Sequence, residues 1–355
     1  MLQGNIEQNG KSAPAEIVVY ASLGYPHAEK DCWRAQIQGR LFQDSPVPLG
    51  KRLMLKGLQR AMKVQKPATD SLIFQERVKG FLVSPEPGRR IRVEIAGRVF
   101  RVRRRSRRSG LFTGKIDVPK TIVESWRSKN QVAPGEPLPF QAHIVGEPQS
   151  AHGKLYLAPQ SGLSVISDID DTIKLTRVTS RRDMLAHTFA LPFTSMDGMV
   201  DVYLNWASHN AMFHYVSSSP WQIYHHLADF IELAGFPQGS MHLRWFRLRD
   251  EMFKRWQVIR RKSKGGLIAD MIKRMPGRRF VLVGDSGERD PEIYAKLARR
   301  FDDQVSAVVI RDLVENPIDP RRLRKIQRRT GAIPLILFRH SSEILDLVGE
   351  IDRKV

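Results

Sequence analysis

The stretch SVISDIDDTIK, residues 164–174, places three aspartates within four positions, directly after a short apolar run. Side chains alternate along an extended chain, so Asp168 and Asp170 share one face while Asp171 points away. Carboxylates this close repel one another unless a cation offsets their charge. The stretch therefore predicts either an acidic turn or a site that holds a positive ion.

Apolar runs of the same kind recur beyond residue 162, each followed by a loop and a helical pattern: LSVISD, MFHYVSSS, RRFVLVGD and VSAVVIRD. Such runs between helices are typical of a parallel α/β sheet with helices on both faces. Sites in these sheets form beyond the carboxyl ends of the strands. The polar residues expected there are Asp168, Asp170, Thr172, Ser217, Ser218, Ser219, Asp285, Ser286 and Asp290, with Lys264 at the start of a preceding helix.

A different pattern covers residues 17–156, where short β-type runs are broken by Gly, Pro and Ser clusters. These runs predict an antiparallel sandwich or barrel, interrupted by a helix at about residues 52–66. We expect a β-rich, basic N-terminal domain over residues 1–160 and an α/β domain over residues 161–355. A basic helix is expected at residues 321–329.

The 355-residue chain has a formal net charge of +21, which attracts polyanions such as nucleic acid, anionic lipid or phosphorylated substrates. The densest basic run spans residues 88–110, and its alternation at residues 98–103 predicts a half-buried strand. Its arginines fit either a solvated sheet edge or an anion-binding patch. Only Phe100 interrupts the run with an aromatic ring, which disfavours a single-strand nucleic-acid groove.

Other compositional features exclude several classes of protein. No apolar run approaches the roughly 20 residues that cross a bilayer, and the polar N-terminus lacks the pattern of a secretory signal. We therefore expect a cytoplasmic protein, with peripheral membrane association as an option. Cys32 is the only cysteine, so disulfide frameworks and cysteine-rich zinc sites are excluded.

The residues at the strand ends suit phosphoryl transfer to water through an enzyme carboxylate. Mg²⁺ prefers oxygen ligands, which Asp168 and Asp285 offer, and Asp290 would anchor a metal-bound water. Asp168 can attack phosphorus, while Asp170 can protonate the leaving oxygen and later deprotonate water. The predicted stabilisers of the transferring phosphoryl group are Ser217 and Lys264. Each motif alone is also common in turns and helix caps, but their combination favours a site.

The motifs and their order resemble the haloacid dehalogenase superfamily of phosphatases. DIDDT matches its first motif, the serine of YVSSSP its second, Lys264 its third and GDSGERD its fourth. The stretches VISDIDDTIKLTRV, FHYVSSSPWQIY, GSMHLRWF and FVLVGDSGERDPEIYAKLARRF are similar to the actin-patch phosphatidate phosphatase group and its bacterial relatives, over about residues 162–311. The N-terminal region is similar more loosely, and its arginine-rich RRRSRRSGLF departs from the group's pattern.

This resemblance implies a Rossmann-like parallel sheet with a small lid, preceded by a sandwich-like domain. It implies Mg²⁺-dependent hydrolysis of phosphatidate to diacylglycerol and phosphate. The implied catalytic residues are Asp168, Asp170 and Lys264; the implied metal ligands are Asp168, Asp170, Asp285 and Asp290; and the implied phosphate-binding residues are Thr172, Ser217, Ser218 and Lys264. The implied partner is an anionic phospholipid or a membrane surface.

Three alternatives remain open from the sequence. The same chemistry can serve a soluble phosphomonoester or a nucleic-acid end, and the chain can instead be an inactive binding module. The lid implied between residues 176 and 206 carries Met184, Leu185, Phe189, Leu191, Phe193 and Met199. These fit acyl chains or an ordinary helical core face. Lys174 and Arg177 fit either head-group steering or solvated surface charge.

Overall fold

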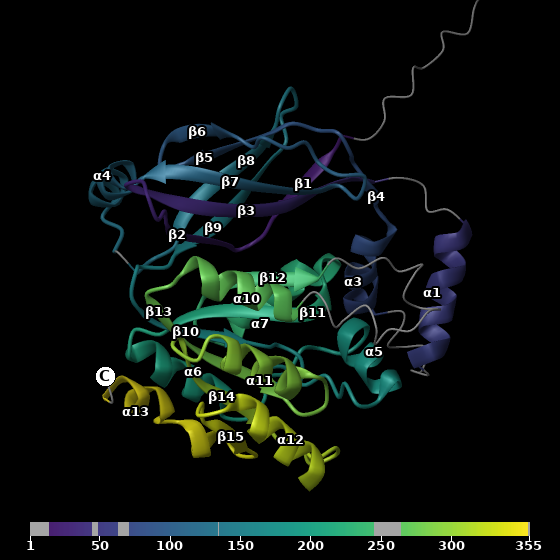
Figure 1. The fold of residues 1–355 in the computed structure, drawn as a ribbon. Coiled ribbons are helices and arrows are strands. Elements are labelled where there is room, and N and C mark those ends of the chain that lie inside the picture. The colour runs from purple at the N-terminus through teal and green to yellow at the C-terminus, as the bar shows by residue number, and fades with distance from the viewer. Residues whose placement is uncertain (1–13, 45–48, 63–70, 134, 245–263, 354–355) are drawn as a thin grey trace, which may run out of the picture.

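The computed structural model describes residues 14–44, 49–62, 71–133, 135–244 and 264–353, arranged around two sheets (Figure 1). The second sheet has six parallel strands in the described chain. They are β10 (Gly162–Ser167), β11 (Met212–Pro220), β12 (Gly239–Arg244), β13 (Arg278–Asp285), β14 (Val305–Arg311) and β15 (Leu335–Phe338). The predicted mixed α/β architecture with a parallel sheet is thereby confirmed.

Helices cover both faces of this sheet. One face packs against α5 (Arg181–Phe189), α6 (Met199–Ser208) and α7 (Tyr224–Leu233), and the other against α10 (Lys264–Arg274) and α11 (Asp290–Arg300). Alternate residues of β13 serve the two cores: Val281 and Val283 belong to the first, Phe280 and Leu282 to the second. Each such buried side chain stabilises the fold by about 1.5–3 kcal/mol.

The strand order fixes where a site can form. The order is β12-β11-β10-β13-β14-β15. β10, the first strand of this sheet in the sequence, lies in the middle; β11 and β12 lie on one side of it, and β13, β14 and β15 lie on the other. In open α/β sheets, the crevice at such a reversal is where ligands bind. The reversal lies between β10 and β13, and Asp168 and Asp285 lie at the carboxyl ends of these strands.

The N-terminal strands form one continuous nine-stranded sheet in the described chain. They are β1 (Glu16–Val19), β2 (Ser22–Pro26), β3 (Cys32–Gln43), β4 (Ser84–Pro85), β5 (Ile91–Ile95), β6 (Arg98–Arg101), β7 (Leu111–Pro119), β8 (Leu138–Ile144) and β9 (Ser150–Leu157). All pairings are antiparallel except β2 with β9, and residues of β3, β5, β7 and β8 enclose one apolar core.

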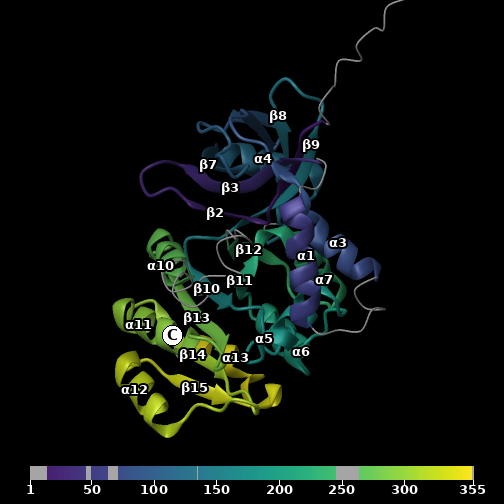
Figure 2. The ribbon, with the colours of Figure 1, turned by 90° about the vertical axis from the view of Figure 1, so that its right-hand side faces the viewer.

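Three further helices interrupt these strands. The predicted helix is α1 (Leu49–Met62), whereas α3 (Leu72–Leu82) and α4 (Lys120–Asn130) escaped the sequence analysis. Figure 2 shows α1 and α3 beside α5 and α7, and their apolar residues Met62, Phe74 and Phe81 belong to the core that faces the parallel sheet. The helices α1 and α3, although they lie within residues 1–160, therefore pack as part of the α/β unit.

The arginine-rich run forms a sheet edge. β6 ends the strand order, and its Arg98 and Arg101 are exposed. The predicted half-buried alternation is wrong at Val99, which is 61% exposed, because nothing packs on that side of the hairpin in the described chain. The basic helix is confirmed as α12 (Pro320–Thr330). The chain ends in η2 (Ser341–Ile344) and α13 (Leu347–Arg353), and no described helix is long and apolar enough to span a bilayer.

A buried polar network crosses the middle of the parallel sheet. His214 contacts the hydroxyls of Ser240 at 2.8 Å and Ser164 at 3.1 Å. Arg278 Nε donates to Ser164 Oγ at 2.8 Å, and His242 Nε2 lies 3.0 Å from Ser240 Oγ. His242, for which the sequence offered no role, therefore belongs to this network. Its members connect four neighbouring strands and satisfy polar groups that burial would otherwise penalise.

We expect this network to make the fold acid-sensitive. Burial lowers the pKa of His242 from 6.5 to about 4, with the charge of Arg274 acting in the same direction. A histidine whose pKa is lower in the folded state contributes stability above its unfolded pKa, and this stability is lost as pH falls. The contribution of His242 is about 3 kcal/mol. Urea unfolding between about pH 7 and pH 4 should show a smaller loss of stability for His242→Gln than for wild type; equal losses would contradict the assignment.

Candidate active site

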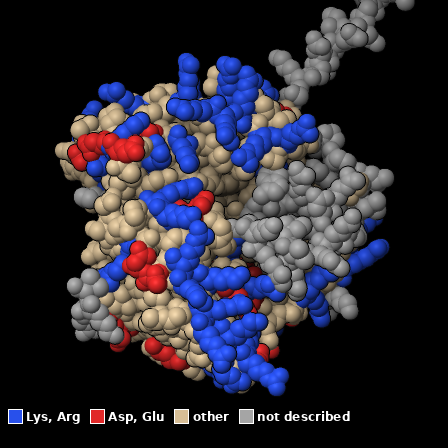
Figure 3. Space-filling model, in the orientation of Figure 1, with Lys and Arg blue, Asp and Glu red and all other residues tan. Residues whose placement is uncertain are grey.

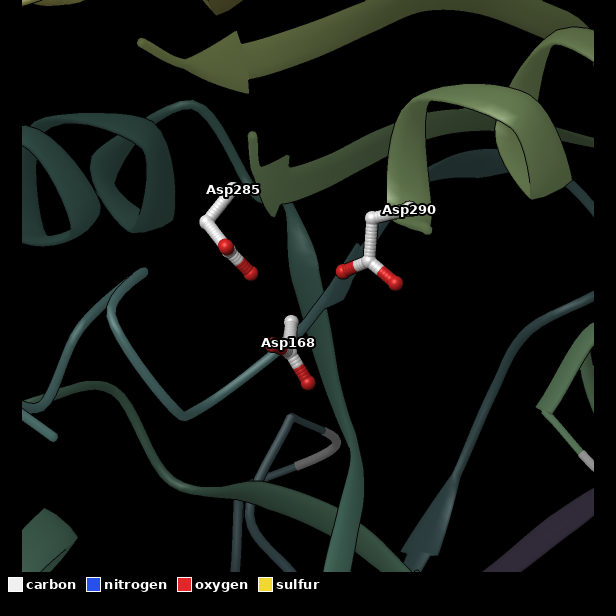
Figure 4. Close-up of side chains that lie close together, drawn as sticks. All are labelled: Asp168, Asp285 and Asp290. Atoms are coloured by element: carbon white, nitrogen blue, oxygen red, sulfur yellow. The ribbon is translucent and has the colours of Figure 1, made fainter. Parts of the chain in front are cut away.

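Three aspartates from three elements converge at the reversal of the strand order. Asp168 follows β10, Asp285 ends β13 and Asp290 begins α11. Their carboxylates face a common space (Figure 4), and one ligand oxygen of each lies within 4.8 Å of the others. The hydrogen bond from Asp168 N to Val283 O, at 2.9 Å, extends the pairing of β10 with β13 and fixes the position of the first carboxylate. All three aspartates are buried.

Lys264 supplies the positive charge within this group. Its Nζ lies 2.8 Å from Asp168 Oδ1 and donates to both oxygens of Asp290 at 2.7 Å. Burial raises the pKa of Asp168 well above its ordinary range, against the opposing charge of Lys264. Burial alone would lower the pKa of Lys264, but the carboxylates of Asp168 and Asp290 raise it well above its ordinary value. The lysine is therefore held as a cation.

The three carboxylates fit a divalent cation. Asp285 Oδ1 accepts the backbone N–H groups of Gly287 at 2.7 Å and Glu288 at 3.2 Å, which orients the side chain. Its Oδ2 is buried and has no hydrogen-bond partner among the described residues. A buried carboxylate oxygen without a donor is costly unless a positive ion completes its coordination. The oxygen-only donor set suits a hard ion such as Mg²⁺.

Asp170 belongs to a second cluster, beside the first. Its Oδ2 accepts hydrogen bonds from Ser219 Oγ at 2.7 Å and Ser217 Oγ at 3.0 Å. Its Oδ1 accepts from Thr176 Oγ1 at 2.8 Å and lies 2.9 Å from Lys174 Nζ. Burial alone would raise the pKa of Asp170, but the charge of Lys174 and these hydrogen bonds lower it below its ordinary value. The carboxylate is therefore ionised in this state.

The structure places the other predicted residues as follows. The Asp170 side chain is outside the three-carboxylate group, so its part as a metal ligand stays a prediction. Thr172 is fully buried, and its hydroxyl has no hydrogen-bond partner among the described residues. Ser217 contacts Asp170, while Ser218 is only half-buried. The phosphate-binding roles of these residues also stay predictions.

Asp171 has a structural role. Its backbone φ is 54°, in the left-handed region that aspartate tolerates better than most residues. Its carboxylate accepts the backbone N–H groups of Thr176 and Arg177 at 2.7 Å and of Val178 at 2.6 Å. The side chain thus shapes the turn after β10. It points away from the carboxylates of Asp168 and Asp170, as the alternation of side chains predicted.

Sequence reasoning placed Ser219 at the site but missed the contacts by which Lys174, Thr176 and Ser219 hold Asp170. Lys174 is only 1% exposed, so the interpretation as solvated charge is wrong for it, whereas Arg177 is exposed. The one signal in the sequence for these contacts was position along the chain. Lys174 follows Asp170 by four residues, and Ser219 lies in the serine triplet. Spacing along an irregular turn does not fix which side chains meet, so this signal is weak.

Arg322 is a further residue that the sequence did not single out. It extends from α12 and donates to the backbone carbonyls of Ser286 and Glu288, each at 2.8 Å. Its Nε also pairs with Glu292 Oε1 at 2.9 Å. These bonds hold the loop between Asp285 and Asp290, and they explain why Arg322 is half-buried on the basic helix.

The segment at residues 176–206 contains α5 and α6. Phe189 and Met199 are buried in the core beside the parallel sheet, and Leu185 and Phe193 pack against that core. This supports the interpretation as a helical core face for these positions. Met184 and Leu191 are half-buried. The existence of a lid stays a prediction.

Comparisons with known proteins agree with these motifs. Residues 163–312 match the family described as phosphatidate phosphatase APP1, catalytic domain. The phosphatidate phosphatase APP1 of Saccharomyces cerevisiae is 31% identical over 297 residues, which make up 81% of this chain and 47% of that protein. An uncharacterized protein of Schizosaccharomyces pombe is 33% identical over 161 residues, covering 44% of this chain and 26% of that protein. The chain thus spans at most about half the length of these two relatives.

A solved structure of a putative phosphatase of the haloacid dehalogenase type, from Mesorhizobium loti, is 15% identical. It covers 54% of this chain and 86% of that one, with a TM-score of 0.33, which is too low to establish a shared fold. The family match and the yeast relative confirm the resemblance that the motifs predicted.

Proposed function

We propose that this chain is a Mg²⁺-dependent phosphatase that hydrolyses phosphomonoesters through an aspartyl-phosphate, with phosphatidate as its substrate. The observation that carries the proposal is the buried group of Asp168, Asp285 and Asp290 around Lys264, directly beside Asp170. A divalent cation held by these three side chains would favour their ionised form and would attract a phosphate group.

The chain's own residues divide the reaction between them. Asp168 forms the bond to phosphorus, and Lys264, already 2.8 Å from its Oδ1, stabilises the charge of the transferring oxygens. Asp170, which is ionised before the substrate binds, takes up a proton with the substrate and gives it to the leaving oxygen as the phosphorus–oxygen bond breaks. It then takes a proton from the water that releases phosphate and restores Asp168. The hydroxyls of Thr172 and Ser217 are proposed as donors to the phosphoryl oxygens.

Asp168, Asp285 and Asp290 are the residues that would hold the metal. When bound, Mg²⁺ would neutralise phosphate charge and so reduce the repulsion between the substrate and the carboxylates. Lys264 also holds Asp290 in position, because its Nζ donates to both oxygens of that carboxylate. The lysine thus connects the predicted metal ligands to the predicted nucleophile.

A phosphate-release screen tests this proposal. Phosphatidate in mixed micelles, a nucleotide monophosphate and a 5′-phosphorylated oligonucleotide should be compared with and without Mg²⁺. We expect release from phosphatidate to be the fastest and to stop when EDTA removes the metal. Faster release from the nucleotide or the oligonucleotide would move the substrate to the alternative class, and no release from any compound would favour the inactive binding module.

The partner we propose is an anionic membrane surface, approached from the cytoplasm. The exposed basic residues of α10, α11 and α12, together with Arg289 just before α11, are here called the basic helix face: Lys273, Arg289, Lys296, Arg299, Arg300, Arg321, Arg324, Lys325 and Arg328. Figure 3 shows Lys and Arg gathered over the side of the molecule on which these helices lie in Figure 1. No large exposed hydrophobic side chain belongs to these helices in the described chain, so the attraction is electrostatic.

Vesicle binding should therefore depend on lipid charge and on salt. A fourfold Gln variant of Arg321, Arg324, Lys325 and Arg328 should bind phosphatidylserine-containing vesicles roughly 10³-fold more weakly, since each basic side chain near such a surface contributes about 1 kcal/mol. The matched control replaces four exposed arginines of the N-terminal run: Arg103, Arg104, Arg107 and Arg108. Equal losses in the two variants would contradict the basic helix face, and salt-insensitive binding to neutral vesicles would contradict the electrostatic attraction.

A further inference from the structure

The outer edge of β6 has backbone groups that no described strand pairs. β6 ends the strand order of the N-terminal sheet and pairs only with β5 among the described residues. Val102 N donates to Ile91 O at 3.0 Å, just beyond the end of β6. Hydrogen-bonded and non-hydrogen-bonded pairs alternate along an antiparallel ladder, so the N–H and C=O groups of Val99 and Arg101 point away from β5. Another strand can add to such an edge.

This edge carries positive charge without a carboxylate partner in the described chain. The nearby carboxylates of Glu86 and Glu147 pair with Arg89, at 3.0 Å and 2.9 Å. Arg92 on β5 lies directly opposite Arg101, an arrangement of like charges that destabilises a sheet. Figure 3 shows Lys and Arg gathered at the upper end of the molecule, where β5 and β6 lie in Figure 1. The exposed arginines of β6 and of the loop after it include Arg98, Arg101, Arg103, Arg104, Arg107 and Arg108.

The loop that follows β6, residues 103–110, is fixed by hydrogen bonds around one buried serine. Ser106 is 5% exposed; its N–H donates to Arg89 O at 2.9 Å, and its carbonyl accepts from Gly88 N at 2.8 Å. Its hydroxyl donates to Glu86 O at 2.8 Å and accepts from Arg89 N at 2.9 Å. The exposed arginines on either side of Ser106 therefore extend from a preorganised loop, which lowers the entropy cost of binding a partner.

The side chains of β6 alternate in a way that defines a complementary strand. Val99 is 61% exposed, whereas Phe100 points to the opposite face and packs against the core of the N-terminal sheet. Arg98 and Arg101 flank these two residues, so β6 has the pattern basic, apolar, apolar, basic. Apolar pairs and pairs of opposite charge across strands each stabilise a sheet. A complementary strand, in either direction, thus has two apolar residues between two acidic ones.

We propose that the open edge of β6 binds an extended acidic segment of a partner protein, which adds to the sheet as a further strand. Backbone hydrogen bonds to Val99 and Arg101 supply the pairing, the apolar residues of the segment cover Val99, and its carboxylates pair with the arginines. The proposal goes beyond the phosphatase function and does not depend on it.

Other occupants of this edge fit fewer of the observations. A nucleic acid would also attract the arginines, but it would leave the open backbone groups and Val99 without partners, and Phe100 packs against the core instead of offering its ring for stacking. An anionic membrane leaves the same backbone groups unpaired. A second copy of this edge would bring like charges together, which opposes pairing between two copies.

Two labelled peptides test the proposal by fluorescence anisotropy with the full chain. The peptide Glu-Glu-Val-Val-Glu-Glu matches the complementary pattern, and Glu-Glu-Pro-Pro-Glu-Glu has the same charge but lacks two backbone N–H groups. We expect the proline peptide to bind about tenfold more weakly or worse, because backbone hydrogen bonds supply much of the affinity in strand addition. Hydrogen exchange followed by NMR should show that the valine peptide protects the amides of Val99 and Arg101.

Two variants separate the backbone contribution from the charge contribution. Val99→Pro removes an N–H that points away from β5 and so leaves the existing ladder intact, as proline on edge strands does. It should weaken binding of the valine peptide about tenfold, whereas Val99→Thr, which keeps the N–H, should change it less than about threefold. The fourfold Gln variant of Arg103, Arg104, Arg107 and Arg108 should also lose about tenfold, since exposed ion pairs are individually weak. The fourfold Gln variant of the basic helix face is the matched charge control and should bind the peptide as wild type does.

The possible outcomes each decide the matter. Equal affinity for the two peptides, or no protection of Val99 and Arg101, would overturn strand addition. A single-stranded oligonucleotide that binds more tightly than the valine peptide, and loses its affinity in the arginine variant, would assign the edge to nucleic acid instead. Failure of the folded wild-type chain to bind the valine peptide would also overturn the proposal. If Val99→Pro does not fold, the two peptides and the exchange measurement on the wild-type chain give the answer.

Discussion

Replacing Asp168 with Asn should abolish the release of phosphate from every phosphomonoester that the wild-type chain hydrolyses. The amide keeps the shape of the side chain but cannot form the aspartyl-phosphate, so the loss should be about 10³-fold or more, as for other enzymes that lose their nucleophile. The fold should persist, because Lys264 still donates to both oxygens of Asp290 when Asp168 is replaced. Phosphate release with excess Mg²⁺, together with the urea midpoint, measures the two effects separately.

The matched control is Asp201→Asn, which makes the same chemical change at an exposed position of α6. It should retain wild-type activity. If Asp168→Asn released phosphate at the wild-type rate while the control did so too, the residue would not be the nucleophile. An activity loss in Asp168→Asn accompanied by a large fall in the urea midpoint would instead mark a folding defect.

The sequence predicted those parts of the site that depend only on the pattern of apolar residues and on the order of the strands along the chain. Apolar runs fixed the positions of β10, β11, β13 and β14, and parallel strands place their carboxyl ends at one edge. The convergence of Asp168, Asp285 and Asp290 with Lys264 followed from that rule. These residues meet because they follow neighbouring strands, and strand ends can be identified from the pattern of apolar residues alone.

The contacts of Asp170 could not be predicted in the same way. Lys174 is one of 58 lysines and arginines, and nothing in its local sequence separates it from the solvated ones. Its burial depends on a turn shaped by Asp171 and on the Phe193 ring, which is fixed by Arg77 from a helix almost a hundred residues earlier. Such arrangements depend on the packing of segments that are distant in sequence, so a local sequence pattern cannot predict them.

The packing of the β-rich sheet against the parallel-sheet unit also depends on residues that are distant in sequence, so it was not predicted. Arg40, on β3, places its guanidinium 3.4 Å from the centre of the ring of Trp221, the residue that follows β11. Ala21 N donates to the hydroxyl of Tyr224 at 2.7 Å, and Ala21 O accepts from Met241 N at 2.9 Å. The end of β11, which carries Ser217 and Ser219, is therefore supported from the β-rich side, which a boundary near residue 160 did not suggest.

Replacing Lys264 with Met should lower the stability of the metal-free protein strongly, as well as its activity. The lysine is the cation between Asp168 and Asp290, and all three side chains are at most 5% exposed. Removal of one partner of a buried ion pair leaves an uncompensated buried charge, at a cost of about 3–5 kcal/mol. Urea unfolding in EDTA near neutral pH should therefore give a much lower midpoint than wild type. Lys296→Met, at an exposed position on α11, should shift stability by less than about 0.5 kcal/mol.

A second substitution separates lost charge compensation from lost packing. If the cost of Lys264→Met comes from the unpaired carboxylates, the double variant Lys264→Met and Asp290→Asn should be more stable than the single variant, because one buried negative charge is gone. Packing alone predicts that the two losses add, since the amide fills the same volume as the carboxylate but cannot replace the methylene contacts of lysine. Recovery of stability in the double variant would show that this site stores electrostatic repulsion, which a bound divalent ion can relieve.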